Sequence, residues 1–301
     1  MAKNPRIIPF AKRSTSRAAL LPIFGLLAIA ADTKPPELDG PLRLIPEKAI
    51  EASYAHRNEP LPDRMAAVSE VFLGVPYADG LQGEGRPPDE DPPARYDSFD
   101  CVTLLEEVLA LSMAPHPSSA ADFRKAFRYR DGLASYSTRN HFFATQWVLQ
   151  NLQNGLLEDT TESYAQALWL EKELTENTWR YWSSRQKFEL SDYELPKGLY
   201  SFPVLTLRTA LSVVDKIRPG TIVVTVREPK PNVPIMVTHV GFTIPGDEPT
   251  MRHATKMGIG RVRDHSLKWY LEHLQTYTNW PVAGVMLLEP IEQGPRLAVT
   301  K

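Results

Sequence analysis

Three residues of this chain carry side chains suited to nucleophilic catalysis: the single cysteine, Cys101, and two of the seven histidines, His239 and His253. A cysteine thiolate attacks a carbonyl carbon, an imidazole takes and returns the proton, and a third polar group orients that imidazole. Because such groups meet only in the folded protein, their wide separation in the sequence is no obstacle. The surrounding elements must therefore bring them together.

The stretch 97–111 predicts a buried helix with Cys101 in its first turn. Capping residues such as Asp100 precede an apolar stripe that runs from Cys101 to Leu111. Because the positive end of a helix dipole favours a thiolate, we expect the pKa of Cys101 to lie below the usual value of about 8.5.

The two histidines lie on predicted strands. Residues 221–226, 237–244 and 250–254 are rich in β-branched side chains and indicate successive strands. His253 follows His239 by 14 residues, with a short Pro-Gly-Asp turn between them. This spacing suits neighbouring antiparallel strands, so the two imidazoles are expected side by side on one face.

The remaining elements complete an α+β fold in which helices precede an antiparallel sheet. The predicted elements are helices over 59–71, 118–131, 141–153, 160–185, 203–216 and 266–274, and further strands at 261–263 and 283–288. A helical N-terminal half that carries the nucleophile at a helix start is therefore expected to pack on a C-terminal sheet.

The N-terminal segment, residues 1–31, has the features of a secretory signal peptide. Five basic and no acidic side chains precede a short apolar run that ends in small residues. An uncleaved anchor is the alternative, but the run is short for a membrane span. Residues 32–58, with four prolines, are expected to be an extended tether. Residues 59–292 are expected to be a single catalytic domain and residues 293–301 a tail.

Charge and cysteine content restrict the function. Removal of the five basic residues of the leader changes the net charge from −2 to −7. An acidic exported chain is a poor nucleic-acid binder, and we expect a periplasmic monomer with no stable membrane span once the leader is removed. A single cysteine excludes an internal disulfide and a multi-cysteine zinc site, and we expect no metal or cofactor.

Four motifs in the same order resemble the NlpC-type papain-like peptidases that cut bacterial cell walls. They are Gly74–Tyr77, Phe99–Cys101, Thr238–Gly241 and His253–Ala254. The chain is more narrowly similar to the N-acetylmuramoyl-L-alanine amidase-like family of that superfamily. Residues 72–74, 128–132 and 137–142 and the region around Gly284 carry the narrower resemblance. It covers roughly residues 60–290 and implies a papain-like fold.

The resemblance implies a role for each catalytic residue. Cys101 matches the nucleophile, His239 the general base, and His253 the third polar group, which orients His239. Tyr77 matches a tyrosine whose hydroxyl lies near the nucleophile; the alternative is a loop tyrosine packed on the core. Backbone N–H groups at the helix start are expected to hold part of the oxyanion.

Substrate contacts are implied for three more residues. Arg139 and His141 match an Arg-x-His stretch that we expect to face the cleft and to hold a substrate carboxylate or sugar. The alternative is a surface arginine and a helix-start histidine. In endopeptidase members of the superfamily, the aspartate at the Asp100 position and a following serine hold the free amine of L-Ala. Here Val102 replaces that serine, which favours cleavage between N-acetylmuramic acid and L-Ala.

We therefore predict an exported cysteine amidase that acts on peptidoglycan or muropeptides. One alternative is a γ-D-Glu-diamino acid endopeptidase on stem peptides, and another is a non-catalytic relative that binds muropeptides. An acyltransferase on the same fold and a metal site made of Cys101, His239 and His253 also remain open. The chain contains no H-E-x-x-H motif and no cysteine pair that would support the metal site.

Overall fold

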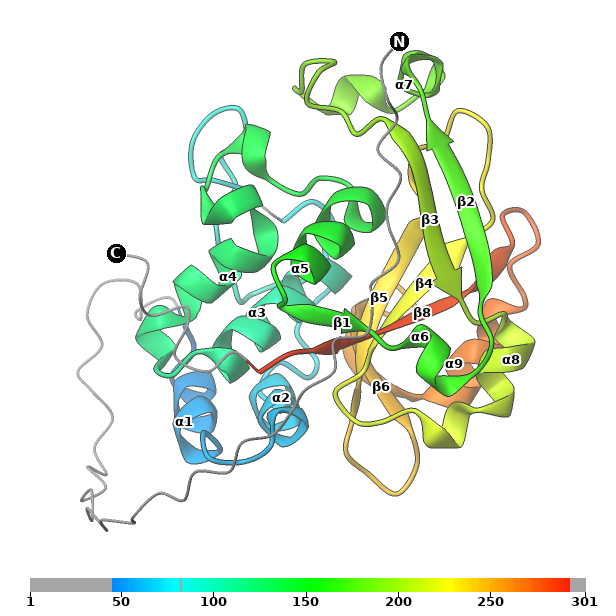
Figure 1. The fold of residues 1–301 in the computed structure, drawn as a ribbon. Coiled ribbons are helices and arrows are strands. Elements are labelled where there is room, and N and C mark those ends of the chain that lie inside the picture. Colours follow the sequence, from blue (N-terminus) through cyan, green and yellow to red (C-terminus); the bar gives the residue numbers. More distant parts are fainter. Residues whose placement is uncertain (1–44, 82, 293–301) are drawn as a thin grey trace, which may run out of the picture. The chain divides into compact units, whose positions relative to one another are not determined.

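The antiparallel sheet that carries two of the predicted site residues is the centre of the fold (Figure 1). The computed structural model describes residues 45–81 and 83–292. Within these ranges, six strands form one sheet in the order β1-β8-β4-β5-β6-β7, and every neighbouring pair is antiparallel. The strands are β1 (Leu157–Asp159), β4 (Ile222–Arg227), β5 (Val237–Ile244), β6 (Thr250–Thr255), β7 (Arg261–Ser266) and β8 (Val282–Pro290).

Both faces of this sheet are buried. In β4, Ile222 and Val224 belong to the main core, whereas Val223 packs with the helices on the other face. Successive side chains of a strand point to opposite faces, so one strand contributes to two layers. The result is a sheet between two helical layers, which explains why neighbouring residues of β4 on opposite faces are both apolar.

The helices divide between these two layers. The larger layer holds α3, whose first residue is Cys101, and its neighbours, and the smaller one holds α8 and α9. The helices are α1 (Glu47–Ala55), α2 (Leu61–Glu70), α3 (Cys101–Met113), α4 (Ala120–Arg128), α5 (Leu149–Gln153), α6 (Thr161–Tyr164), α7 (Glu176–Tyr181), α8 (Leu207–Ser212) and α9 (Leu267–Leu274). None of the helices in the described ranges is long and apolar enough to cross a membrane.

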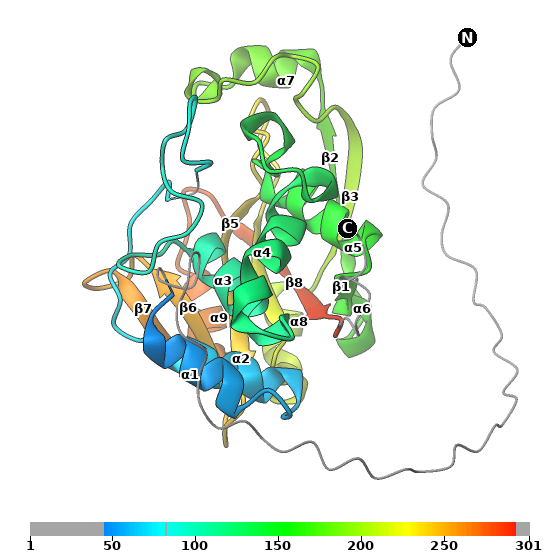
Figure 2. The same ribbon diagram turned by 90° about the vertical axis from the view of Figure 1, so that its left-hand side faces the viewer.

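A two-stranded hairpin lies outside the main sheet. It pairs β2 (Leu168–Leu174) with β3 (Gly198–Val204) and carries α7 at its far end, away from α1 and α2 in both Figure 1 and Figure 2. The helix predicted over 160–185 is therefore wrong in its middle part, because pairing with β3 overrides the local helical preference. The helix predicted over 203–216 begins only at Leu207, after the end of β3.

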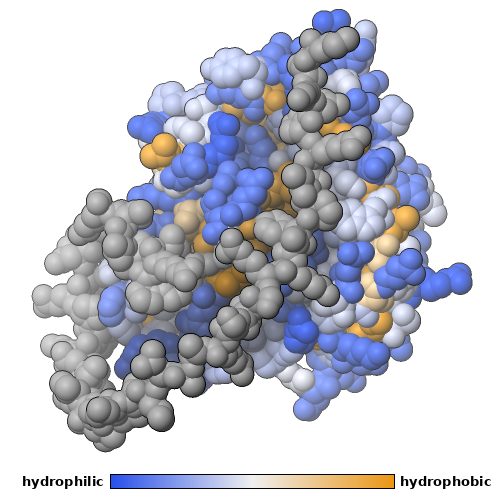
Figure 3. Space-filling model, in the orientation of Figure 1, coloured by the Kyte–Doolittle hydropathy of each residue, from blue (hydrophilic) through white to orange (hydrophobic). Residues whose placement is uncertain are grey.

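The other predicted helices and strands agree with the structure in type. The α+β arrangement with a helical N-terminal half on an antiparallel sheet is confirmed. The helix predicted over 141–153 is a π-helix at Phe143–Val148 followed by α5. On the face shown in Figure 3, hydrophilic side chains predominate and hydrophobic ones appear in small separate areas.

The extended tether predicted for residues 32–58 is wrong from Glu47 onward, where α1 begins. The prolines of this region end at Pro46, which precedes the helix, so none of them interrupts it. Ile50 is buried and the Ser53 hydroxyl donates to the Leu111 carbonyl of α3 at 2.9 Å. The first part of the tether, the signal peptide predicted at 1–31 and the tail at 293–301 lie outside the described residues.

Candidate active site

Cys101 is the first residue of α3, as its sequence context predicted. The carboxylate of Asp100 accepts hydrogen bonds from the backbone N–H groups of Val102 at 3.0 Å and Thr103 at 2.7 Å. The Thr103 hydroxyl oxygen in turn accepts from the Asp100 N–H at 2.9 Å, which completes a capping box. This double cap fixes where the helix begins and therefore where the thiol stands.

Buried ion pairs hold the nucleophile helix against its neighbours. Arg128 of α4 donates to Glu106 of α3 at 2.7 Å, and the Trp147 indole donates to the same carboxylate at 2.9 Å. Arg124 pairs with Glu107 one residue further along α3. Because a buried charge is tolerated only when it is paired, these contacts lock α4 to α3.

Three histidines on adjacent strands form a hydrogen-bonded chain. His239 Nε2 on β5 lies 2.7 Å from His253 Nδ1 on β6, and His253 Nε2 lies 2.8 Å from His265 Nδ1 on β7. The 14-residue spacing predicted the first of these contacts. Because His239 uses Nε2 toward His253, its Nδ1 is the ring nitrogen left to accept a proton from a nucleophile.

The third histidine, His265, was missed from the sequence. In the register of β6 and β7, His265 lies opposite Met251, two residues along from the partner of His253. His253 and His265 are therefore diagonal neighbours on one face of the sheet. The strand was predicted only at 261–263, whereas β7 continues to Ser266. With three more residues, the predicted strand would have included His265.

Gly241 explains the glycine of the His-Val-Gly motif. A Cβ at this position would come within 2.9 Å of the His253 Cβ and of the Arg252 carbonyl oxygen. Real side chains do not pack that closely, so any larger residue would displace β6. The glycine therefore allows the two strands that carry His239 and His253 to lie close together.

Burial determines the charge state of the proposed nucleophile and base. Burial, with a smaller contribution from the nearby Asp100 carboxylate, raises the pKa of the Cys101 thiol to about 12. Burial likewise lowers the pKa of His239 to about 4 and that of His253 to about 2. The predicted pKa below 8.5 for Cys101 is therefore wrong, because loss of solvent around the sulfur outweighs the favourable helix start. At neutral pH both groups are uncharged.

The groups that change the pKa of the Cys101 thiol show which residues lie near it. The backbone N–H of Val240, the residue that follows His239, hydrogen-bonds the Cys101 sulfur and lowers its pKa. Burial raises the pKa values of Tyr77 and Tyr270, and the negative charge of a Cys101 thiolate raises both further. The Cys101 sulfur thus lies against β5, the strand that carries His239, and close enough to Tyr77 to affect its pKa.

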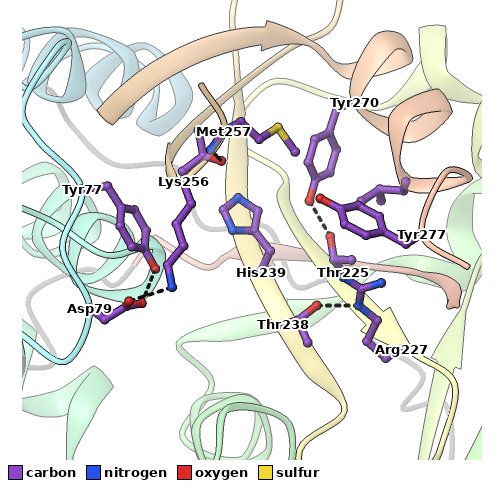
Figure 4. Close-up of a pocket in the computed structure, with 12 residues that line it drawn as sticks. Tyr77, Asp79, Thr225, Arg227, Thr238, His239, Lys256, Met257, Tyr270 and Tyr277 are labelled. Carbon is purple, nitrogen blue, oxygen red and sulfur yellow. Dashed lines mark hydrogen bonds and ion pairs between the residues drawn. The ribbon is translucent and has the colours of Figure 1, made fainter. Parts of the chain in front are cut away.

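A cavity of about 260 Å³ lies beside His239. Figure 4 shows His239 between two groups of side chains, with Tyr77, Asp79 and Lys256 on one side and Arg227 and Tyr277 on the other. The Tyr77 hydroxyl donates to Asp79 at 2.9 Å, and Asp79 also pairs with Lys256 at 2.6 Å. Tyr77 therefore lines the cavity with its hydroxyl held by a carboxylate, and its ring also packs against the main core.

Arg139 does not reach this cavity. It is buried, and its guanidinium donates to Glu84 at 2.7 Å and to Asp89 at 2.8 Å. These two carboxylates belong to a proline-rich loop, residues 83–95, that precedes α3. Arg128 donates to the Pro93 carbonyl of the same loop at 2.7 Å. The expected role in holding a substrate carboxylate is not supported, because the loop already supplies two carboxylates to Arg139.

His141 and Asp100 also have partners within the chain. His141 Nε2 bonds the Tyr136 carbonyl at 2.7 Å, its ring packs on Phe188, and burial lowers its pKa to about 4. It does not line the cavity beside His239. The Asp100 carboxylate serves as the cap of α3, so its observed role is structural.

The alternative of a metal site finds no geometric support in the described ranges. No group of three or more His, Cys, Asp or Glu side chains there is arranged to hold a metal ion. The three histidines instead bond one another, nitrogen to nitrogen, at 2.7 and 2.8 Å.

Comparisons with known proteins identify what the chain resembles. A family model described as N-acetylmuramoyl-L-alanine amidase-like matches residues 67–277, a range that contains Cys101 and all three linked histidines. A solved protein of Legionella pneumophila str. Philadelphia 1 is 24% identical over 81% of this chain and 93% of its own, with a TM-score of 0.71. An N-acetylmuramoyl-L-alanine amidase from Bacteroides uniformis ATCC 8492 is 22% identical over 76% of this chain and 98% of its own, with a TM-score of 0.62. The two structures share the fold. No curated protein matches the chain.

Proposed function

Because the chain belongs to the N-acetylmuramoyl-L-alanine amidase-like family, we propose that it is a cysteine-dependent amidase. Its proposed reaction is hydrolysis of the amide between N-acetylmuramic acid and L-Ala in peptidoglycan or muropeptides. The observation that carries this proposal is the 2.7 Å bond between His239 Nε2 and His253 Nδ1 beside the thiol of Cys101. Acyl transfer by a cysteine requires a nucleophile, a base and a group that orients the base; the His239–His253 bond supplies the last two.

The fold is proposed to be papain-like, of the NlpC type. A nucleophile at the first position of a helix, set against an antiparallel sheet that presents the base, supports this assignment. Three of the four motifs that carry the sequence resemblance lie at the start of α3, on β5 and on β6. The fourth, Gly74–Tyr77, pairs with Phe99 and with Arg261 of β7. No cofactor is needed for the reaction, since the chain supplies every group used in the steps below.

In the first step the Cys101 sulfur attacks the lactyl carbonyl carbon while its proton passes to His239 Nδ1. The carbonyl oxygen becomes an oxyanion. Asp100 already accepts from the N–H groups of Val102 and Thr103, so we assign the backbone N–H of Cys101 to the oxyanion.

Collapse of this intermediate breaks the carbon–nitrogen bond. His239 returns its proton to the departing L-Ala nitrogen, which leaves as a free amine, and the lactyl group stays on Cys101 as a thioester. A water molecule then attacks the thioester carbon and gives its proton to His239, and the sulfur leaves and recovers a proton from the imidazolium. His253 holds the ring of His239 in place through both halves of the reaction.

We also propose that the protein acts outside the cytoplasm, in the periplasm, and as a monomer. The basic and apolar residues of segment 1–31 support export. A fusion of this segment to a reporter that is active only after export tests the proposal, with Lys12 and Arg13 changed to Glu as the matched control.

The experiment that tests the reaction is a digest of purified muropeptides with the full chain, read by mass spectrometry. A free stem peptide with L-Ala at its amino end is expected from the wild type and not from Cys101→Ala. Release of an L-Ala–D-Glu dipeptide would replace the amidase with an endopeptidase. Binding of muropeptides without any cleavage would instead identify a non-catalytic relative.

A further inference from the structure

The cavity beside His239 contains a guanidinium that no carboxylate within residues 45–81 and 83–292 neutralises. Arg227, at the end of β4, donates through Nε to the Thr238 hydroxyl at 2.9 Å and through Nη1 to the Trp280 carbonyl at 2.6 Å. Its guanidinium also stacks on the Tyr277 ring at 4.5 Å. Across the described ranges, every ion pair of the chain lies elsewhere.

Two contrasts make this arginine stand out. Arg139 is bound by two carboxylates, and Lys256, the other cation that lines the cavity, is paired with Asp79 at 2.6 Å. Arg227 instead touches neutral oxygens and aromatic faces, which fix its plane without cancelling its charge. Its remaining donor group, Nη2, has no hydrogen bond to the described part of the chain. A fixed guanidinium with a free donor edge is suited to a planar anion.

We propose that Arg227 binds a carboxylate of the substrate, namely the α-carboxylate of D-Glu in the second position of the stem peptide. This inference rests on the proposed function. In the stem, D-Glu is linked through its γ-carboxyl, so its α-carboxylate is free, and one residue, L-Ala, separates it from the scissile amide.

The position of Arg227 relative to the base fits this distance. Its guanidinium is tied to Thr238, the residue that precedes His239 on β5. Two residues of an extended peptide span about 7 Å, which is the scale of a two-residue step along a strand. A carboxylate on Arg227 therefore leaves the preceding amide near His239. The same contact gives the site a preference for stem peptides with a free α-carboxylate on D-Glu over those in which it is an amide.

Binding to a Cys101→Ala parent protein tests the inference, because this variant cannot form the thioester. The probes are two soluble muropeptides that differ only in carrying D-Glu or D-isoglutamine, whose α-carboxyl is an amide, at the second position. By titration calorimetry we expect the parent to bind the D-Glu form about 10- to 100-fold more tightly, the range for a hydrogen bond to a charged group. This comparison changes only the ligand, so it does not depend on the folding of an Arg227 variant.

Variants then assign the preference to the side chain. Arg227→Gln is expected to abolish the preference by weakening the D-Glu form alone, and Arg227→Lys to keep part of it. Lys256→Gln, the matched control from the opposite wall, should leave the ratio of the two dissociation constants unchanged. Thermal melting checks that each variant is folded.

Three outcomes would overturn the inference: equal affinity of the parent for both probes, no binding of either, or a preference that survives in Arg227→Gln. The result is independent of which bond is cut. A chain that cleaves no muropeptide but shows the Arg227-dependent preference would refute the proposed reaction and support the inference.

Discussion

Cys101 is expected to react slowly with iodoacetamide at neutral pH, although it is the proposed nucleophile. Burial, with a smaller contribution from Asp100, raises its pKa from 9.0 to about 12. A rise of three units lowers the fraction of reactive thiolate at neutral pH about 1,000-fold. The folded protein should therefore be alkylated about 1,000 times more slowly than the same chain in denaturant.

The assay is simple because the chain has one cysteine. Every iodoacetamide adduct seen in the intact-protein mass spectrum reports on Cys101, and rate constants can be collected from pH 6 to pH 10. A sulfur that is only shielded from the reagent would lose the same factor at every pH. A raised pKa instead predicts a rate that increases tenfold per pH unit throughout the range.

Asp100→Asn separates the two causes of the shift. Asparagine keeps the oxygen that caps α3 and is as good an N-cap as aspartate, but it carries no charge. The thiol pKa should fall, and alkylation at neutral pH should accelerate by up to about tenfold, the effect of one pKa unit. A wild-type rate equal to that of the unfolded chain would refute the reasoning, because it would mean that the pKa of Cys101 is not raised in the folded protein.

Three further outcomes follow from the contacts around the site. His265→Asn keeps an acceptor near the Nδ1 position and should retain most activity, whereas His265→Leu should lower kcat/KM on muropeptides about tenfold and shift its pH profile. Gly241→Ala forces a Cβ against His253 and should lower the free energy of unfolding in urea by about 1–3 kcal/mol. Glu106→Ala leaves the buried Arg128 guanidinium unpaired and should cost about 3–5 kcal/mol in the same measurement, with Glu106→Gln closer to the wild type.

Local patterns predicted the elements that carry the proposed catalytic residues. The helix at Cys101 combines a strong cap with a helical apolar stripe, and both signals are contained within 15 residues. His239 and His253 were paired correctly in space because a short turn between antiparallel strands restricts the register. The strand β2 was missed because its partner, β3, begins 24 residues after the end of β2, and no pattern within residues 160–185 reports that pairing.

The charge state of the buried thiol and the distant partners of the buried arginine could not be predicted from the sequence. The dipole of α3 was a correct reason to lower the Cys101 pKa, but burial depends on packing against β5, which no local pattern reveals. The substrate role expected for Arg139 came from the Arg-x-His match. Its carboxylate partner Glu84 lies 55 residues away in the chain, so no local pattern reveals that pair. Arg227 was not predicted as a site residue because it belongs to no motif. Only the folded structure shows that it lines the cavity.

On the proposed mechanism, the proton leaves the sulfur only as the substrate carbonyl is attacked. The raised pKa of Cys101 and the lowered pKa of His239 both oppose charge separation in the resting site.

His253 helps at the moment of proton transfer because its own pKa of about 2 keeps it neutral. A neutral His253 Nδ1 accepts the Nε2–H bond of His239 and stabilises the new imidazolium, whereas a charged ring would repel it. His265, which keeps part of its surface exposed, accepts from His253 in the same direction and extends the polarised chain toward solvent. The histidine chain thus performs the orienting role that a carboxylate or amide performs in other triads.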